Sequence, residues 1–165
     1  MKRQVAIAAL FLSGFAHAEI TLSGKPDNNF TQDAHQHQES RQKLITEAKI
    51  DRDSFSQKVQ NTCDTIAPRD AVAKFKKMTT QLLGSPMSFE DAGYTEENYR
   101  KVITFTCYKG ANWTINGLDK QMESQMLQSV KDRESAAVTT NDKAAAAGFK
   151  IAIEATQQGI VAARK

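Results

Sequence analysis

Two histidines, His35 and His37, come closest to a metal site in this chain of 165 residues. Imidazole nitrogens with the carboxylates of Asp33 and Glu39 nearby are ligands that suit a divalent transition metal. The stretch around them is polar, however, and specific metal binding needs ligands held by a rigid frame and an outer shell of partners. We therefore expect no bound metal and no other cofactor, and metal binding through this pair is kept only as an alternative.

Motifs for catalysis are missing from the sequence. It contains no G-x-S-x-G elbow, no Gly-rich phosphate-binding loop and no CxxCH haem attachment. Adjacent carboxylates occur at Glu90-Asp91 and Glu96-Glu97, but adjacent residues on a helix do not face each other. We therefore do not expect an enzyme, and a carboxylate-based hydrolase is the least favoured alternative.

The sulfur-containing side chains suggest structure rather than chemistry. Cys63 and Cys107 are the only cysteines, and they lie too far apart for the CxxC spacing of zinc and redox sites. Two cysteines in an exported protein most simply form one disulfide, so we expect a Cys63–Cys107 bridge. Met122 and Met126 are one helical turn apart, a spacing that is more typical of core packing than of a Cu(I) site.

The aromatic residues near Cys107 are candidates for contact with a partner. Trp113, the single tryptophan, and Tyr108 would serve as anchors for another protein if they were exposed. The alternative is that Trp113 is a core residue beside the disulfide. Asn112-Trp113-Thr114 also matches an N-glycosylation acceptor, which we interpret as a chance match because the N-terminal segment has a bacterial form.

The N-terminal residues 1–18 have the three parts of a secretory signal peptide. Lys2 and Arg3 precede an apolar run over 5–15, and Ala16-His17-Ala18 follows as a cleavage box. The apolar run is shorter than the ~20 residues that a membrane span requires, and no second run of that length follows. We expect cleavage after Ala18, a periplasmic or secreted protein, and no membrane span.

The next segment, 19–38, is polar and has little to bury, which predicts a flexible N-terminal arm. Loss of Lys2 and Arg3 with the signal would leave 20 basic and 19 acidic residues, a net charge of +1. A nucleic-acid-binding protein is expected to carry a basic stripe instead. We therefore do not expect a nucleic-acid partner.

Residues 39–165 are expected to form a single helical domain. Apolar residues at helical spacing predict a helix over 39–61, a second one that starts at Pro68 and ends before Gly84, and two more. Those two run from Asn116 or Gly117 to about 137, and from about 142 to 163. Residues 64–67 are expected to break the chain between the first two helices.

The segment around Cys107 is ambiguous. Thr95 and the glutamates after it predict a helix start, whereas residues 102–108 are rich in β-branched and aromatic side chains. We expect a helix from 96 that changes to extended chain near 104. The resulting fold is mainly α, with four to five helices in a bundle and one disulfide. The main alternative is an α+β fold with a small hairpin at about 102–116.

Taken together, these observations predict an exported, non-enzymatic helical protein that acts by binding another protein. An adaptor, an inhibitor or an accessory component of a cell-envelope assembly would fit this description. The prediction depends on the exclusion of other classes and on the polar arm, which suits a segment that orders on binding. The alternative is a periplasmic protein that binds a small ligand or a metal.

Overall fold

The computed structural model describes residues 21–25, 49–90, 92 and 95–164. Within them, the chain is mainly α-helical, as predicted, and a disulfide joins Cys63 to Cys107. The elements are, in chain order, β1 (Thr21–Ser23), β2 (Lys49–Asp51), the 3-10 turn η2 (Arg52–Ser54), α2 (Gln57–Asn61), the π-helical turn η3 (Thr62–Ile66), α3 (Ala67–Leu83), α4 (Glu96–Ile115), α5 (Asp119–Ala136) and α6 (Thr140–Ala163).

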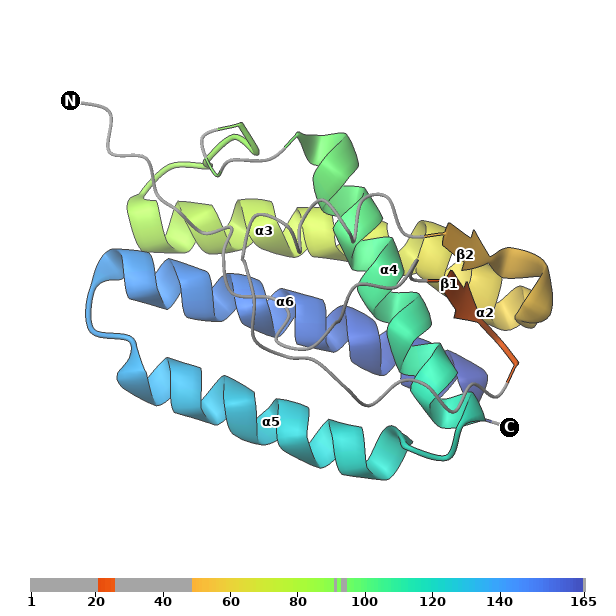
Figure 1. The fold of residues 1–165 in the computed structure, drawn as a ribbon. Helices are drawn as coiled ribbons and strands as arrows, with labels where there is room; N and C mark the ends of the chain where they lie inside the picture. The colour runs from red at the N-terminus through yellow and green to blue at the C-terminus, as the bar shows by residue number, and fades with distance from the viewer. Residues whose placement is uncertain (1–20, 26–48, 91, 93–94, 165) are drawn as a thin grey trace.

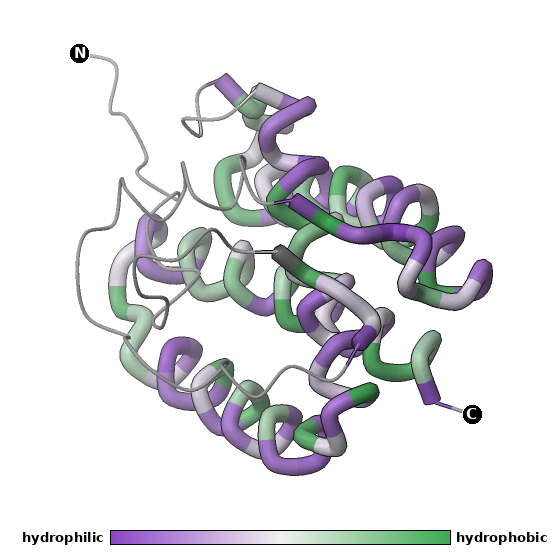
Figure 2. The backbone as a smooth tube through the Cα atoms, turned by 45° about the vertical axis from the view of Figure 1, so that its right-hand side comes forward, coloured by the Kyte–Doolittle hydropathy of each residue, from purple (hydrophilic) through white to green (hydrophobic). Residues whose placement is uncertain are grey.

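Three long helices lie side by side, and the fourth crosses them (Figure 1). Helix α6 lies between α3 and α5, and α4 crosses α3 and α6 on one side of this layer. The largest helix contact in the described part is between α4 and α6, so α6 is the central element. Hydrophobic positions recur between hydrophilic ones along the helices (Figure 2), as expected for helices that bury one face.

Local capping signals delimit the helices. The Thr95 hydroxyl accepts a hydrogen bond from the Asn98 N–H at the start of α4. At the start of α6, Thr139 and Asp142 form a reciprocal capping box, in which each side chain accepts from the other residue's N–H. Gly84 ends α3 in the left-handed region, with φ of 78°, where a residue without Cβ is favoured.

The predicted break at 64–67 is wrong, because the chain stays helical from α2 into α3. The turn η3 connects the two helices, and the Ala67 N–H reaches back five residues to the Thr62 carbonyl. Such a π-helical turn holds one extra residue. We attribute it to Pro68, which lacks the N–H that a regular α-helix would use and whose ring crowds the preceding turn.

Residues 102–116 are helical, so both the change to extended chain near 104 and the hairpin are wrong. Helix α4 runs without interruption from Glu96 to Ile115. All residues from Phe105 to Trp113 are buried, so this stretch lacks the alternation of apolar and polar residues that marks a half-buried helix. Tertiary burial here overrides the β propensity of the β-branched side chains.

The predicted helix over 39–61 is wrong at residues 49–54, which form β2 and η2, and its part before 49 lies outside the described residues. The strand β2 pairs in parallel with β1, and Leu22 lies opposite Ile50. Leu22 is fully buried, so the flexible arm predicted for 19–38 is wrong at 21–25. The rest of that arm and the signal peptide at 1–18 lie outside the described residues.

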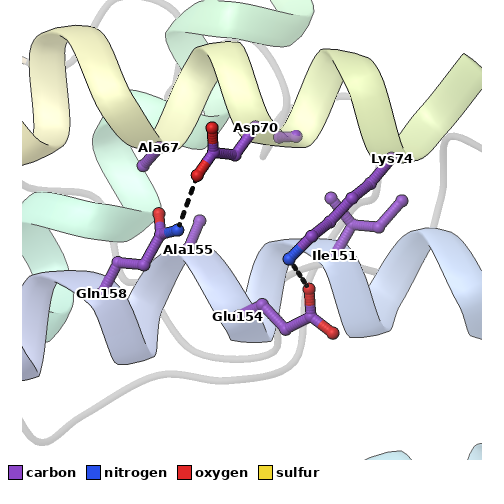
Figure 3. A pocket seen from close by; sticks show the side chains of 8 residues that line it. Ala67, Asp70, Lys74, Ile151, Glu154, Ala155 and Gln158 are labelled. Carbon is purple, nitrogen blue, oxygen red and sulfur yellow. Dashed lines mark hydrogen bonds and ion pairs between the residues drawn. The ribbon is translucent and has the colours of Figure 1, made fainter.

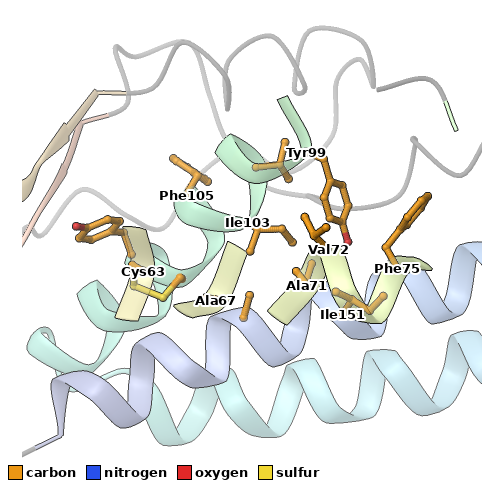
Figure 4. Close-up of a cluster of buried hydrophobic side chains, with 14 of the residues drawn as sticks. Cys63, Ala67, Ala71, Val72, Phe75, Tyr99, Ile103, Phe105 and Ile151 are labelled. Atoms are coloured by element: carbon orange, nitrogen blue, oxygen red, sulfur yellow. A yellow bond between two sulfur atoms is a disulfide. The ribbon is translucent and has the colours of Figure 1, made fainter. Parts of the chain in front are cut away.

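The core lies between α3, α4 and α6 and includes the disulfide (Figure 4). Phe75 stacks on Phe89 with ring centroids 4.5 Å apart, and Tyr99 leans on both rings. A smaller cluster of Trp113, Met126 and Ile160 lies under α5. None of the helices described here is long and apolar enough to cross a membrane.

Candidate functional site

The two aromatic residues predicted to face a partner are both buried. Tyr108 is 0 % exposed and Trp113 is 5 % exposed, so the expectation of exposed anchors is wrong and the core alternative holds. The Tyr108 hydroxyl donates a 2.9 Å hydrogen bond to Asp64, which also accepts from Arg52. Burial and the Asp64 carboxylate raise the pKa of Tyr108 above its usual range. This network fastens η2 and η3 to α4 beside the disulfide.

Trp113 belongs to the small cluster under α5, which also contains the predicted methionines. Met126 is buried against it and Met122 packs on the cluster edge, so the methionines have the predicted packing role. Asn112 is buried in α4, which leaves the Asn112-Trp113-Thr114 sequence unable to accept a glycan in the folded chain. The aromatic signal near Cys107 is therefore a signal of the core.

The histidine pair His35 and His37 lies outside the described residues. Among the residues that the structure does describe, no group of three or more His, Cys, Asp or Glu side chains converges to hold a metal ion.

A small hollow with space for about one water molecule lies between α3 and α6 (Figure 3). Its floor is apolar, and its rim is polar and more exposed. The floor consists of Ala67, Ala71, Ile151 and Ala155, and the rim of Asp70, Lys74, Glu154 and Gln158. The alanines allow α3 and α6 to lie close together, and each helix supplies two polar residues one turn apart to the rim. We call this site the α3–α6 groove.

Two cross-helix contacts bound the α3–α6 groove. The Lys74 ammonium pairs with the Glu154 carboxylate at one end. At the other end, the Gln158 Nε2 donates to the Asp70 Oδ2 at 3.3 Å, which is the amide orientation that a carboxylate acceptor requires. The amide oxygen, Gln158 Oε1, is buried and accepts no hydrogen bond from the part of the chain that the structure describes.

Charged contacts also bridge the opposite side of α6, toward α5. Lys150 pairs with Glu134 at 3.1 Å. Near the C-terminal end, the Arg164 guanidinium contacts both Asp119 and Glu123. The hydrogen bond from Arg164 holds the pKa of the Asp119 carboxyl below its usual range. The side of α6 that faces away from α4 is thus flanked by polar contacts on both edges.

Lys109 is a buried basic residue that the sequence patterns did not single out. It lies on α4 with only 8 % of its surface exposed, and its Nζ lies 4.9 Å from the centroid of the Trp113 ring. Burial lowers the pKa of Lys109 to about 7. A lysine within a continuous run of buried residues has no local sequence signal, because helical spacing does not separate it from its apolar neighbours.

Comparisons of the chain with known protein families, with characterised proteins and with solved structures found no match.

The α3–α6 groove was also missed by the sequence patterns, although a partial signal exists. Asp70 with Lys74, and Glu154 with Gln158, are polar pairs at i, i+4 spacing on two predicted helices. Such pairs occur on any solvated helix face, so they do not reveal that the two helices are neighbours. Only the packing of α3 on α6 brings the four side chains together.

Proposed function

We propose that this chain is an exported, non-enzymatic protein, periplasmic or secreted, that acts by binding another protein as an adaptor, an inhibitor or an accessory component of an envelope assembly. The Cys63–Cys107 disulfide supports export, because disulfides form and persist in oxidising compartments. The signal-like residues 1–18 agree with this assignment.

The observation that carries the choice of binding surface is the side of α6 against which none of the described elements packs. Three sides of this helix pack against α4, α3 and α5. The fourth side is a stripe of Lys150, Glu154, Gln157 and Val161, which recur at helical spacing and are exposed or half-buried. We call this stripe, together with the adjoining sides of α3 and α5, the three-helix face.

The three-helix face has the mixed character of a non-obligate protein interface, which is about as polar as the rest of a protein surface. Val161 is 59 % exposed at one end of the stripe, and the α3–α6 groove opens beside its middle. Pockets for small molecules usually span roughly 300–1,000 Å³. The groove has space for only about one water molecule, so it does not have the size of a small-molecule pocket.

A photo-crosslinking amino acid placed at Gln157 tests this surface in native cells. We expect one discrete cross-linked product, because Gln157 lies in the middle of the stripe. The same amino acid at Asn61, which is exposed on α2, should not give that product.

A pair of matched substitutions then tests the role of the surface in binding. Val161→Asp should abolish the product, whereas Val138→Asp should leave it unchanged, because Val138 is an exposed valine at the turn between α5 and α6. Equal products from Gln157 and Asn61, or equal loss in both valine variants, would contradict the proposed surface.

A further inference from the structure

The turn between α4 and α5 contains Asn116 followed by Gly117, and no other asparagine in the sequence precedes a glycine. Asn116 is the C-cap of α4 and is half-buried, while Gly117 is exposed. Gly117 has a φ of 72°, a backbone conformation that side chains rarely adopt, so the turn itself favours a glycine here. A glycine also leaves its own amide nitrogen without a shielding side chain, which favours attack of this nitrogen on the preceding asparagine.

We propose that Asn116 is a site of spontaneous deamidation, in which the backbone nitrogen of Gly117 is the nucleophile. This nitrogen loses its proton and forms a bond to the side-chain carbon Cγ of Asn116, and the side-chain amide leaves as ammonia. Water then opens the resulting five-membered succinimide at either of its two carbonyl carbons. The products are aspartate and isoaspartate, and in isoaspartate the main chain runs through Cβ and Cγ. The reaction consumes solvent water and uses only groups of this chain.

The native turn holds the two reacting groups apart. The Gly117 N–H donates to the Thr114 carbonyl at 3.1 Å, and the Asn116 Nδ2 donates to the Asn112 carbonyl at 2.8 Å. Asn116 has a ψ of 3°, so the following peptide must rotate before its nitrogen can join Cγ in a flat five-membered ring. Reaction therefore requires the last turn of α4 to open, and the folded chain should react more slowly than the unfolded chain.

Opening of this turn should be local. The turn lies at a helix end, where the free energy of opening is smallest, and it leads into α5, which buries only Met126 and Val130. It also lies beside the C-terminal end of α6 (Figure 1), where Arg164 contacts Asp119 and Glu123 in the first two turns of α5. These contacts hold α5 next to the turn and should therefore slow its opening.

The product cannot restore the native turn. The carbonyl oxygen of Asn112 accepts from both the backbone N–H and the side-chain amide of Asn116. A carboxylate at position 116 has no donor for this oxygen, and it places a negative charge at the negative end of the α4 dipole. Isoaspartate also lengthens the main chain. Deamidation should therefore leave the turn open and loosen the start of α5.

The test follows this modification in the purified exported chain, aged in mildly alkaline buffer with the disulfide intact. Peptide mass spectrometry locates the change from amide to acid, and enzymatic methylation detects isoaspartate. We expect Asn116 to be the first asparagine converted, at a rate about fivefold or more below that of the urea-unfolded chain, because at least one hydrogen bond must break. Below the unfolding transition the rate should depend little on urea, because local opening exposes little surface.

Paired variants test the chemistry and the control by the turn. Asn116→Gln should abolish the modification, because the longer side chain would have to form a larger and less favourable ring. Arg164→Ala should accelerate the modification about two- to fivefold, because it removes the contacts that hold α5 beside the turn. Lys150→Ala removes the pair with Glu134 near the other end of α5 and should leave the rate unchanged.

A second pair of variants tests the effect of the product on the fold. Asn116→Asp, which introduces the charge directly, should lower the melting temperature by about 2–4 °C. Asn98→Asp places the same charge in the first turn of the same helix and should not lower it. A native rate that falls in proportion to the unfolded population, or equally fast conversion of Asn98, would overturn the assignment of Asn116. Equal melting temperatures for Asn116→Asp and the wild type would overturn the opening of the turn.

Discussion

Lys109 combines two opposing effects at a single residue. Burial on α4 penalises the ammonium form and lowers its pKa to about 7. The face of the Trp113 ring, 4.9 Å from Nζ, favours the ammonium form, because an aromatic face attracts a cation more strongly than a neutral amine. The lowered pKa means that burial is the larger of the two effects.

Replacement of Lys109 by methionine should stabilise the protein at neutral pH. Between about pH 7 and the unfolded value of 10.5, the unfolded chain holds a proton on Lys109 that the folded chain lacks. Each unit of pKa difference is worth roughly 1.4 kcal/mol, so the free energy of unfolding should rise by at most about 5 kcal/mol in Lys109→Met. Urea unfolding at pH 7 measures this gain.

The pH dependence of that gain identifies its cause. The wild-type chain should become more stable relative to Lys109→Met as the pH rises from 7 toward 10.5, because the unfolded lysine progressively loses its proton. Below pH 7 the difference should stay constant. The comparison of the two chains cancels the other titrating groups, including Tyr108. A gain that does not change between pH 7 and 10 would show that improved packing, and not the charge, is responsible.

At the scale of elements, the contact between α4 and α6 depends on two glycines. A Cβ on Gly159 would lie 2.8 Å from the carbonyl carbon of Cys107, and closer still to the carbonyl oxygen. A Cβ on Gly110 would in turn collide with the Thr156 carbonyl on α6. Both obstacles are backbone atoms, which cannot rotate away as a flexible side chain can. The two helices can therefore reach this distance only with glycine at both positions.

Gly159→Ala should consequently be strongly destabilising. The Cβ forces α6 away from α4 at the disulfide, and overpacking of this kind costs about 3 kcal/mol or more. Thermal unfolding by circular dichroism measures the loss. Val161→Ala, two residues along and exposed, should change the free energy of unfolding by less than about 0.5 kcal/mol. Similar melting temperatures for the wild type and Gly159→Ala would contradict the close approach.

Features of local chemistry in this fold were predictable from sequence, whereas features of packing were not. Thr95, the turn at Thr139 and the stop at Gly84 each act through neighbouring backbone groups, so local sequence predicts them. Phe105–Trp113 are buried on every side of the helix, so their side chains show no helical period. The sequence pattern therefore does not reveal that this stretch is helical. The strand β2 depends on a partner 28 residues away in register, Thr21 opposite Lys49.

The candidate site shows the same division. The Cys63–Cys107 bridge was predictable, because only two cysteines exist and the sequence suggests export. The α3–α6 groove was not, because its four polar residues look like any solvated helix face until α3 is placed against α6. Trp113 and Tyr108 would contact a partner only if they were exposed, with a core position as the alternative, and the structure buries both.

At the scale of the whole molecule, the disulfide joins two elements that are 44 residues apart in the sequence. It joins η3, just before α3, to the middle of α4, which is the helix that crosses the layer of α3 and α6. Both cysteines are 0 % exposed, and the Asp64–Tyr108–Arg52 network lies beside them. The bridge therefore closes a loop that contains all of α3 and half of α4.

Removal of this bridge by mutation should lower the stability of the whole fold. Chemical reduction of the bridge in the wild-type chain should require unfolding. Closure of a loop of 44 residues is worth about 4 kcal/mol on a chain-entropy treatment, so Cys63→Ala with Cys107→Ala should lose roughly that amount in urea unfolding. In the wild-type chain, dithiothreitol cannot reach sulfur atoms that are fully buried. Intact mass after reduction and alkylation should therefore show an unmodified chain in native buffer and two alkylated cysteines in denaturant.

The rate of alkylation across urea concentrations extends this test to cooperativity. If the bridge opens only by global unfolding, the alkylation rate should follow the unfolding transition seen by circular dichroism. Rapid alkylation of Cys63 and Cys107 in native buffer would show instead that η3 detaches from α4 while the rest stays folded. That result would contradict the role of the disulfide as a buried closure of the core, because a closure that opens locally does not hold α3 and α4 together.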